Sequence, residues 1–226
     1  MNSVRKDYIR PVDFKHGCVD LSHGSGGRAM AQLIDELFLA AFDNEWLRQR
    51  NDQAAFTVPP GRLVMATDSH VVSPLLFPGG DIGCLSVHGT INDVAMSGAV
   101  PLYLAAGFIL EEGFALAELK RIVESMAAAS KEAGVPVVTG DTKVVEKGKG
   151  DGVFITTTGV GVVPDGVQIS GDRARPGDRI LHGMIRRGDG EEIRAVLWFS
   201  DLRDFTGLNE RLPPNQVLDI GLVIEI

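Results

Sequence analysis

The chain has 226 residues, of which 44% are hydrophobic and 23% are charged, and its formal net charge is −8. This length suffices for one large domain, or for one domain and a fragment, and the ordinary charged fraction argues against disorder over most of the chain. The negative charge argues against non-specific binding to nucleic acid or to an anionic membrane, although it leaves local nucleotide binding open.

The N-terminal stretch MNSVRKDYIRPVDF is charged and lacks the apolar segment of a signal peptide. Cys18 and Cys84, the only two cysteines, have no metal-ligand spacing, which is typical of reduced thiols in the cytoplasm. The apolar stretch VAMSGAVPLYLAAGFIL is interrupted by Ser97, Gly98 and Pro101, so it favours a helix end followed by a buried strand over a membrane span. We therefore expect a cytoplasmic protein that binds neither membrane nor nucleic acid.

A glycine-rich segment, SHGSGGR at residues 22–28, precedes the first expected helix. This helix shows the i, i+3, i+4, i+7 spacing of one buried face and is expected to end at Asp43 and Asn44. Its apolar positions are Met30, Leu33, Ile34, Leu37, Phe38 and Ala41. The polar stretch 45–62 indicates a loop, and RLVMATDSHVV at 62–72 is rich in β-forming residues.

The middle of the chain alternates helices and strands. FPGGD predicts a turn, and helices are expected over 82–98 and 115–133, the second ended by Gly134 and Pro136. Strands are expected at PLYLAAGFIL, PVVTGDTKVV and GVFITTTGVGVV, and VEKGKGDG indicates a solvated hairpin loop. This alternation predicts a mixed α and β domain up to about residue 182.

Beyond Gly183 the character of the sequence changes. A charged turn precedes an expected strand, AVLWF, and a short helix interrupted by prolines. Asp201 directly follows that strand, a placement that suits either a metal ligand or an ordinary turn. We expect residues 183–226 to be the opening of another domain that does not continue.

The glycine-rich segment has the composition of a phosphate-binding loop. Glycine permits close approach of backbone N–H groups to a phosphate, and a helix N-terminus adds partial positive charge. The segment matches neither the Walker A spacing nor a GxGxxG turn. The alternative is a flexible entry to the helix with Ser25 as its cap.

Three aspartates lie at expected ends of strands or helices within apolar sequence: Asp68 in ATDSH, Asp93 in TINDVAM and Asp141 in TGDTK. A carboxylate in such surroundings is costly unless something pairs with it, and one shared Mg²⁺ would satisfy all three. Three separate caps or turn residues are the alternative. Lys143, two residues along a strand from Asp141, would either contact a nucleotide phosphate or pair with Asp141.

Three long stretches resemble one family. LSHGSGGRAMAQLIDELF, ATDSHVVSPLLFPGGDIGCLSVHGTINDVAMSGAVPLYL and VTGDTKVVEKGKGDGVFI are similar, in order and spacing over about residues 13–181, to the HypE family of hydrogenase maturation proteins. That family is part of the ATP-using aminoimidazole ribonucleotide synthetase-like superfamily. The resemblance implies an α+β N-terminal domain that dimerises through its sheet into a barrel-like core, with a second α/β domain behind it.

The resemblance also implies an activity and its site. HypE-like proteins use ATP to dehydrate a thiocarboxamide on their own C-terminal cysteine to a thiocyanate, which supplies the cyanide ligands of [NiFe] hydrogenase together with HypF-, HypC- and HypD-like partners. Carried over to this chain, Lys143, Asp93 and Asp141 are catalytic, and Asp68, Asp93 and Asp141 hold Mg²⁺. The residues implied to contact ATP are His23, Gly24, Ser25, Gly26, Gly27, Arg28, Asn92 and Thr142.

The resemblance ends at LHG, residues 181–183. Because the family's second domain and C-terminal cysteine are missing from this sequence, we expect the family reaction to be impaired. IRAVLWFSDLRDFTGLNERLPPNQVLDI is similar instead to the first strand and helix of a class III adenylate or guanylate cyclase domain. The expected organisation is thus an ATP-binding N-terminal domain at 1–182 and an incomplete, truncated or foreign segment at 183–226.

Three functions remain open at this point. The first is a HypE-type enzyme, the second is a non-catalytic ATP-binding or dimerisation module, and the third is a cyclase-derived signalling protein. Slow ATP hydrolysis would separate the first from the second. Cyclic nucleotide production that is lost on Asp201→Ala would support the third.

Overall fold

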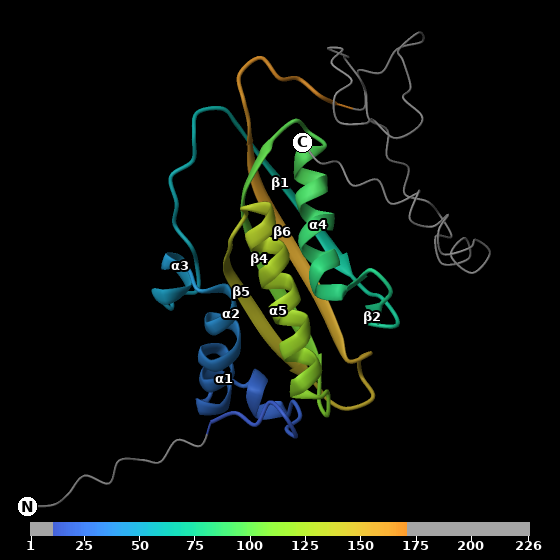
Figure 1. Ribbon diagram of the computed structural model, residues 1–226. Coiled ribbons are helices and arrows are strands. Elements are labelled where there is room, and N and C mark those ends of the chain that lie inside the picture. The colour runs from blue at the N-terminus through green and yellow to red at the C-terminus, as the bar shows by residue number, and fades with distance from the viewer. Residues whose placement is uncertain (1–10, 171–226) are drawn as a thin grey trace, which may run out of the picture. The chain divides into compact units, whose positions relative to one another are not determined.

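The computed structural model describes residues 11–170, which lie almost entirely in the first of two compact units, residues 1–168 and 169–226. The first unit contains a four-stranded sheet in the order β1 (Arg62–His70), β6 (Val153–Val163), β4 (Val100–Glu111) and β5 (Val137–Val145) (Figure 1). β4 and β5 run parallel, and the other neighbouring strands are antiparallel. The expected FPGGD turn is confirmed, since it joins the short strands β2 (Leu76–Phe77) and β3 (Gly80–Asp81).

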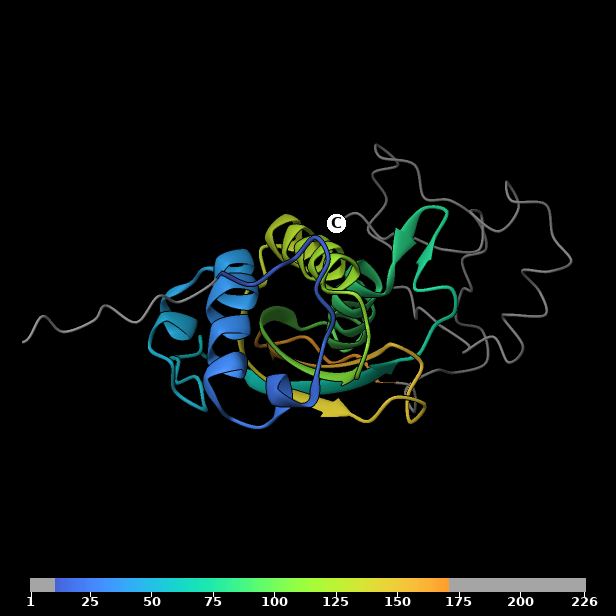
Figure 2. The ribbon, with the colours of Figure 1, turned by 90° about the horizontal axis from the view of Figure 1, so that it is seen from below.

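The sheet has one covered face and one open face. Every second side chain of β4 over residues 104–110 is buried, whereas Ile109 between them is 43% exposed. This alternation follows from the two-residue period of a strand. The helices α4 (Ile82–Ala95) and α5 (Leu116–Ala133) lie together over the covered face, as Figure 2 shows.

The start of α4 and the end of α5 carry the residues that typically cap a helix. Asp81 accepts hydrogen bonds from the N–H groups of Gly83 and Cys84 at the start of α4. Gly134 has a φ of 68° after α5, a left-handed conformation that favours glycine. The two predicted helices are confirmed, with α4 ending at Ala95. None of the helices within residues 11–170 is long and apolar enough to cross a bilayer.

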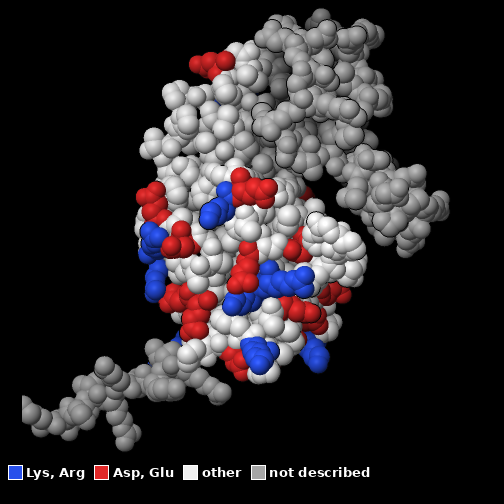
Figure 3. Space-filling model, in the orientation of Figure 1, with Lys and Arg blue, Asp and Glu red and all other residues white. Residues whose placement is uncertain are grey.

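The helix α5 is amphipathic. Its apolar stripe is fully packed into the core, and its outer side carries charges such as the pair Lys120–Glu124, whose Nζ and Oε1 atoms are 3.6 Å apart. Figure 3 shows basic and acidic side chains intermingled over this face. The buried members of the stripe are Leu116, Leu119, Ile122, Val123 and Met126.

The helix that follows the glycine-rich segment runs continuously as α1 (Arg28–Leu33), the π-helical segment η2 (Ile34–Leu39) and α2 (Ala40–Phe42). The predicted helix is confirmed, but its apolar spacing did not reveal the wider π-helical turns, which often occur at functional sites. A short helix, α3 (Glu45–Arg48), follows, because the Asn44 side chain caps the Leu47 N–H. The expectation of an uninterrupted loop over 45–62 is therefore wrong at its start.

The segment VEKGKGDG is solvated, as expected, but it does not form a hairpin. β5 and β6 pair with opposite edges of β4, so the connection between them passes over the end of β4. Glu111, at that end of β4, accepts hydrogen bonds from the N–H groups of Gly148 and Gly152. Both topologies need glycines and polar residues here, so the local sequence does not distinguish them.

Glu111→Gln is expected to weaken this connection in a pH-dependent way. The hydrogen bonds from the Gly148 and Gly152 N–H groups lower the pKa of Glu111 below its usual 4.5. A lowered folded-state pKa stabilises the protein above the unfolded value, and that contribution is lost as the pH falls through the folded value. At neutral pH, urea unfolding should therefore give a modestly higher free energy of unfolding for the parent than for Glu111→Gln. This difference should disappear in strongly acidic solution. An unchanged difference at both pH values would contradict this assignment.

The open face of the sheet is apolar at four exposed positions on β1 and β4. Leu63, Met65, Val100 and Ile109 are 62%, 74%, 55% and 43% exposed. Leu63 and Val100 both flank Val162 of β6 with Met65 close by, whereas Ile109 pairs with Phe154 nearer the other end of the sheet. A cluster of exposed apolar side chains such as the first three is characteristic of an interaction surface. The open face is therefore a candidate contact surface for another protein chain.

Candidate functional site

The glycine-rich segment starts with a tightly capped turn. η1 (Leu21–Gly24) is a single 3₁₀ turn in which the Asp20 side chain accepts the Ser22 N–H at 2.8 Å. The Nδ1 atom of the buried His23 accepts the Asp20 N–H at 3.0 Å and lies 3.4 Å from Asp20 Oδ1. His23 thus serves as the reciprocal cap of the turn, and its contact with ATP stays a prediction.

The rest of the loop is exposed and adjoins β5. A Cβ atom on Gly24 would lie 2.7 Å from the Val144 nitrogen, so only glycine permits this close approach. Gly27, without a side-chain cap, precedes α1, and Ser25 Oγ donates to the Ser22 carbonyl instead. The expectation that Ser25 caps the helix is therefore wrong. Residues 25–28 are exposed, which leaves the helix start accessible to an anion.

Asp141 and Lys143 lie side by side on the open face of β5. Lys143 Nζ is 2.9 Å from Asp141 Oδ2, and the hydrogen bond from Lys143 lowers the pKa of Asp141 below its usual value. The shared face is confirmed, and the ion pair is the alternative that the sequence left open. Thr142 is buried on the opposite face, while its N–H donates to Asp141 Oδ1 at 2.9 Å. We call residues 23–28 and 141–143 the β5 half-site.

A second group of polar residues lies between β1 and α4. His70 Nε2 is 3.1 Å from Asp68 Oδ2 on the covered side of β1. Burial raises the pKa of Asp93 on α4, the negative charge of Asp68 raises it further, and His70 opposes the shift. Asn92 is exposed beside Asp93. We call Asp68, His70, Asn92 and Asp93 the β1 half-site.

The two half-sites lie at opposite edges of the sheet. Asp68 is in register with Gly140 through Thr157 and Ala106, which amounts to three strand spacings, or about 14 Å. Asp141, the next residue, also points to the other face of the sheet. Among residues 11–170, no three His, Cys, Asp or Glu side chains are grouped closely enough to hold a metal ion. The three predicted Mg²⁺ ligands are therefore not brought together within one chain.

A pocket of about 340 Å³ opens beside the β5 half-site. One wall comes from the helix formed by residues 28–42 and the other from the edge of β5, and the lining is mainly apolar with a few polar groups. Arg50, which pairs with Asp35 at 3.0 Å, lies at this pocket. A small-molecule site typically combines such a concave apolar wall with a few polar groups. Among the lining residues are Ile34, Phe38, Thr139, Asp141 and Thr142.

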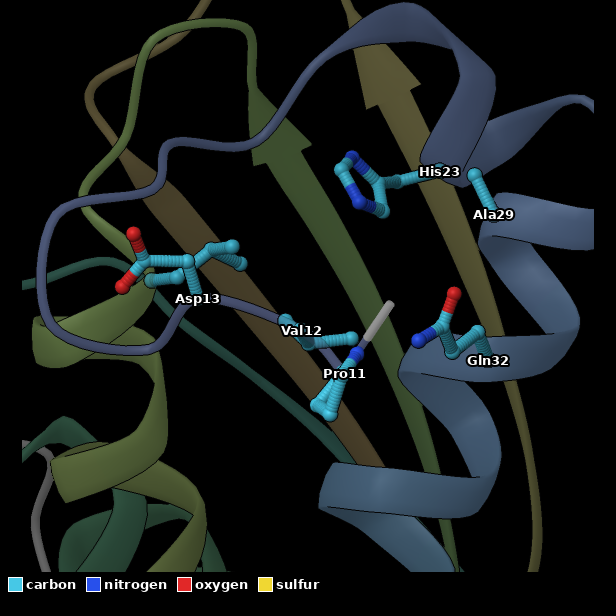
Figure 4. Close-up of a pocket in the computed structure, with 7 residues that line it drawn as sticks. Pro11, Val12, Asp13, His23, Ala29 and Gln32 are labelled. Carbon is cyan, nitrogen blue, oxygen red and sulfur yellow. The ribbon is translucent and has the colours of Figure 1, made fainter. Parts of the chain in front are cut away.

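A second pocket, of about 320 Å³, lies next to η1 and α1. Figure 4 shows the His23 ring and the Gln32 side chain on one side of this space, with Pro11 and Val12 on the other. His23 therefore both caps the turn η1 and lines this cavity. A substitution at His23 would change both the turn and the pocket wall.

Three residues near the two half-sites, His70, Asp20 and Gly89, were not among the predicted site residues. The spacing of two residues between Asp68 and His70 places both on one face of a strand, and the spacing of three between Asp20 and His23 is that of a capping box. These two spacings would have identified the first two residues. Gly89 matters only through its approach to His70, which no local pattern encodes.

The donor chemistry of the β1 half-site fits Mg²⁺. The negative charges of Asp68 and Asp93 repel each other. A hard divalent cation, which prefers oxygen ligands, would relieve this repulsion. Asp141 is exposed at the other half-site and is compensated there by Lys143. Asp68 and Asp93 are thus the candidate cation ligands at this edge of the sheet, and Asp141 lies at the other edge.

Comparison with known proteins identifies relatives of the chain. The family described as AIR synthase related protein, N-terminal domain, matches residues 50–163. The carbamoyl dehydratase HypE of Azotobacter vinelandii is 78% identical over 192 residues, which cover 80% of this chain and 56% of that protein. The chain spans about half the length of the curated relatives that it matches.

Solved structures of HypE proteins are also similar to this chain in fold. A hydrogenase maturation protein HypE in complex with ATP has a TM-score of 0.68 and 57% identity, over 70% of this chain and 47% of that one. A chain from a HypE–HypF complex has a TM-score of 0.51 and 55% identity, over 65% of this chain and 47% of that one. The predicted α+β fold of the aminoimidazole ribonucleotide synthetase-like N-terminal domain is confirmed.

The predictions for the C-terminal part concern residues outside the described range 11–170. They comprise the strand AVLWF, the segment 183–226 and its similarity to a nucleotidyl cyclase. The matches above are to HypE proteins and give the cyclase resemblance no support. The domain boundary near residue 182 stays a prediction.

Proposed function

The chain belongs to the AIR synthase related protein family, of which it carries the N-terminal domain, and on that premise we propose that it binds ATP and Mg²⁺ in hydrogenase maturation. The proposed reaction is the HypE-type dehydration of a carbamoyl-derived thiocarboxamide to a thiocyanate. Because the chain spans about half the length of its curated relatives, the activity of the whole relatives enters here only as a proposal.

One observation carries this proposal. Gly24 of the glycine-rich loop lies against Val144 on β5, which packs toward the core and follows Lys143 directly in the strand. A phosphate chain needs this combination of backbone donors, a cation and a carboxylate that can reach a metal ion. A HypE relative of 57% identity is described as a complex with ATP, which supports the same ligand for this chain.

The proposed chemistry requires the residues to position charge. An amide oxygen is a poor leaving group, but transfer of the ATP γ-phosphoryl group to that oxygen, with release of ADP, would make it a good one. Loss of phosphate together with the protons of the amide nitrogen would then leave a nitrile. Residues 23–28 would approach the ATP phosphates, and Lys143 would stabilise the charge that develops on the transferred group. Asn92 and Thr142 would support this arrangement. Mg²⁺, held by Asp68, Asp93 and Asp141, would neutralise phosphate charge.

This ligand set needs two copies of the chain. Asp68 and Asp141 of one copy are about three strand spacings apart and point to opposite faces, which no single ion can bridge. The apolar open face around Leu63 and Met65 favours the sheet-mediated homodimer that the resemblance implies. We therefore assign Asp68 and Asp93 of one copy and Asp141 of its partner copy to one site.

The proposed partners follow from the resemblance and from one relative. A HypE structure is described as a complex with HypF, which supports a HypF-like partner. HypC- and HypD-like partners and a cytoplasmic location stay predictions. A non-catalytic ATP-binding or dimerisation module, which would bind ATP without turnover, is the alternative.

ATP together with Mg²⁺ is expected to stabilise the parent protein but not Asp141→Ala. A ligand that binds only the folded state adds about 2.7 kcal/mol at about 100 times its dissociation constant. Thermal unfolding with and without ATP and Mg²⁺ measures this increment. The matched control is Asp165→Ala, since Asp165 is an exposed acid outside both half-sites.

The control should respond to ATP and Mg²⁺ like the parent. If the parent itself does not respond, the loop is only a helix entry and the proposed function is wrong. If Asp141→Ala responds fully, ATP binds elsewhere. Phosphate release during incubation then separates the enzyme from the non-catalytic module.

A further inference from the structure

His70 is a buried polar side chain without a hydrogen bond. It is 7% exposed, and neither Nδ1 nor Nε2 has a hydrogen-bond partner in the structure. Nε2 lies 3.1 Å from Asp68 Oδ2, but the alignment is not that of a hydrogen bond. A buried imidazole left in this state costs free energy, so its presence in the β1 half-site calls for a function.

The helix α4 also approaches the His70–Asp68 pair closely, because a glycine stands at the point of contact. A Cβ atom on Gly89 of α4 would lie 2.9 Å from His70 Nε2 and 3.2 Å from Asp68 Oδ2. Glycine lowers the stability of a helix interior, and here its missing side chain lets the His70–Asp68 pair lie against α4. Asp93 lies one turn further along the same helix. Strand, helix and glycine together thus fix where the Asp68 carboxylate lies.

We propose that His70 is a positioning residue, which holds one oxygen of the Asp68 carboxylate so that the other faces a divalent cation shared with Asp93. This inference rests on the proposed Mg²⁺–ATP function. His70 is not itself a third ligand, because the residues described here contain no cluster of three such side chains that could hold a metal ion. Groups that orient a metal ligand from behind are a general feature of metal sites.

The inference explains two observations together. Asp68 is 42% exposed along its side chain, so without a fixed partner its carboxylate would rotate freely between solvent and the half-site. His70 is held rigidly by burial and therefore restricts that rotation. A carboxylate that is already oriented loses less conformational entropy when it binds a cation, which raises the affinity for the cation.

Binding of Mn²⁺ to the full chain tests this role without any turnover. Mn²⁺ is the probe, and the loss of its free electron paramagnetic resonance signal gives the dissociation constant. His70→Phe, which keeps the ring shape, is expected to weaken Mn²⁺ binding about tenfold or more, the usual effect of losing an outer partner. His70→Gln, which keeps a polar side chain at this position, should weaken Mn²⁺ binding less than His70→Phe does. His16→Gln, a change at an exposed histidine, should have no effect.

A second variant disturbs the His70–Asp68 contact from the side of the helix α4. Gly89→Ala keeps every polar group but displaces the His70–Asp68 pair, so it should also weaken Mn²⁺ binding. Thermal unfolding without metal checks that each variant is folded. A folded His70→Phe or Gly89→Ala with parental Mn²⁺ affinity would overturn the positioning role.

Asp68→Asn and Asp93→Asn separate this inference from the proposed function. If both lower Mn²⁺ affinity while His70→Phe does not, the cation site stands and the role of His70 fails. If neither lowers it, the cation site is wrong and the role of His70 falls with it. ATP-dependent stabilisation of the parent then still reports on the nucleotide site alone.

Discussion

Replacing Gly83 with alanine is expected to lower the free energy of unfolding by about 3 kcal/mol, the upper range for overpacking a core. Gly83 lies in the first turn of α4 and is fully enclosed. A Cβ atom there would fall on the backbone carbonyl oxygen of Ile122 in α5, well inside van der Waals contact. A backbone atom in the middle of a helix cannot rotate away, so the two helices would have to separate.

The sign of this effect is diagnostic, because glycine-to-alanine changes in helices usually stabilise. The ordinary gain is up to about 1 kcal/mol from helix propensity. Urea unfolding of the parent and of Gly83→Ala measures the difference directly. Leu85→Ala, on the same helix but at a side chain that is 41% exposed, is the control and should change stability much less. A Gly83→Ala protein as stable as the parent would mean that α4 and α5 pack differently.

The same substitution should reach the β1 half-site. α4 carries Gly89, Asn92 and Asp93, so a shift of its first turn moves these residues against Asp68 on β1. Helix packing and cation binding are thus expected to change together. Leu85→Ala leaves the helix in place and should leave cation binding unchanged.

Local periodicity was sufficient to predict most individual elements. α5 has apolar residues at all buried positions except Ser130, and Gly134 marks its end with the expected left-handed conformation. β5 places Asp141 and Lys143 on one face, because a strand has a period of two. These features depend only on neighbours in the sequence, which is why the sequence predicts them.

The assembly of the site could not be predicted from the sequence. Asp68 and Asp141 are both followed by polar residues in β-rich segments, and nothing local states that their strands occupy opposite edges of the sheet. The order β1-β6-β4-β5 results from pairing between segments far apart in the chain. The same non-local pairing turned the expected hairpin into a connection over Glu111. The sequence therefore identified candidate ligands but not their separation.

That separation leads to the sharpest prediction of the proposed function. If each site combines Asp68 and Asp93 of one copy with Asp141 of the partner copy, Asp68→Ala and Asp141→Ala alone should each abolish ATP-dependent stabilisation. In a mixed dimer of these two variants, one site contains both defects and the other contains none. Random exchange of subunits makes half of the dimers mixed, so about a quarter of the ATP sites should be restored.

The stoichiometry of ATP binding at saturation, in the presence of Mg²⁺, measures this recovery after the two variants are denatured together and refolded. The control mixture is Asp68→Ala with Asp93→Ala. These residues belong to the same half-site, so every dimer formed from them keeps a defect in each site, and no binding should return. Recovery in the first mixture alone would require that the partner copy supplies Asp141. Absence of recovery in both mixtures, from variants that still dimerise, would assign all the ATP-binding groups to one chain and would remove the composite site.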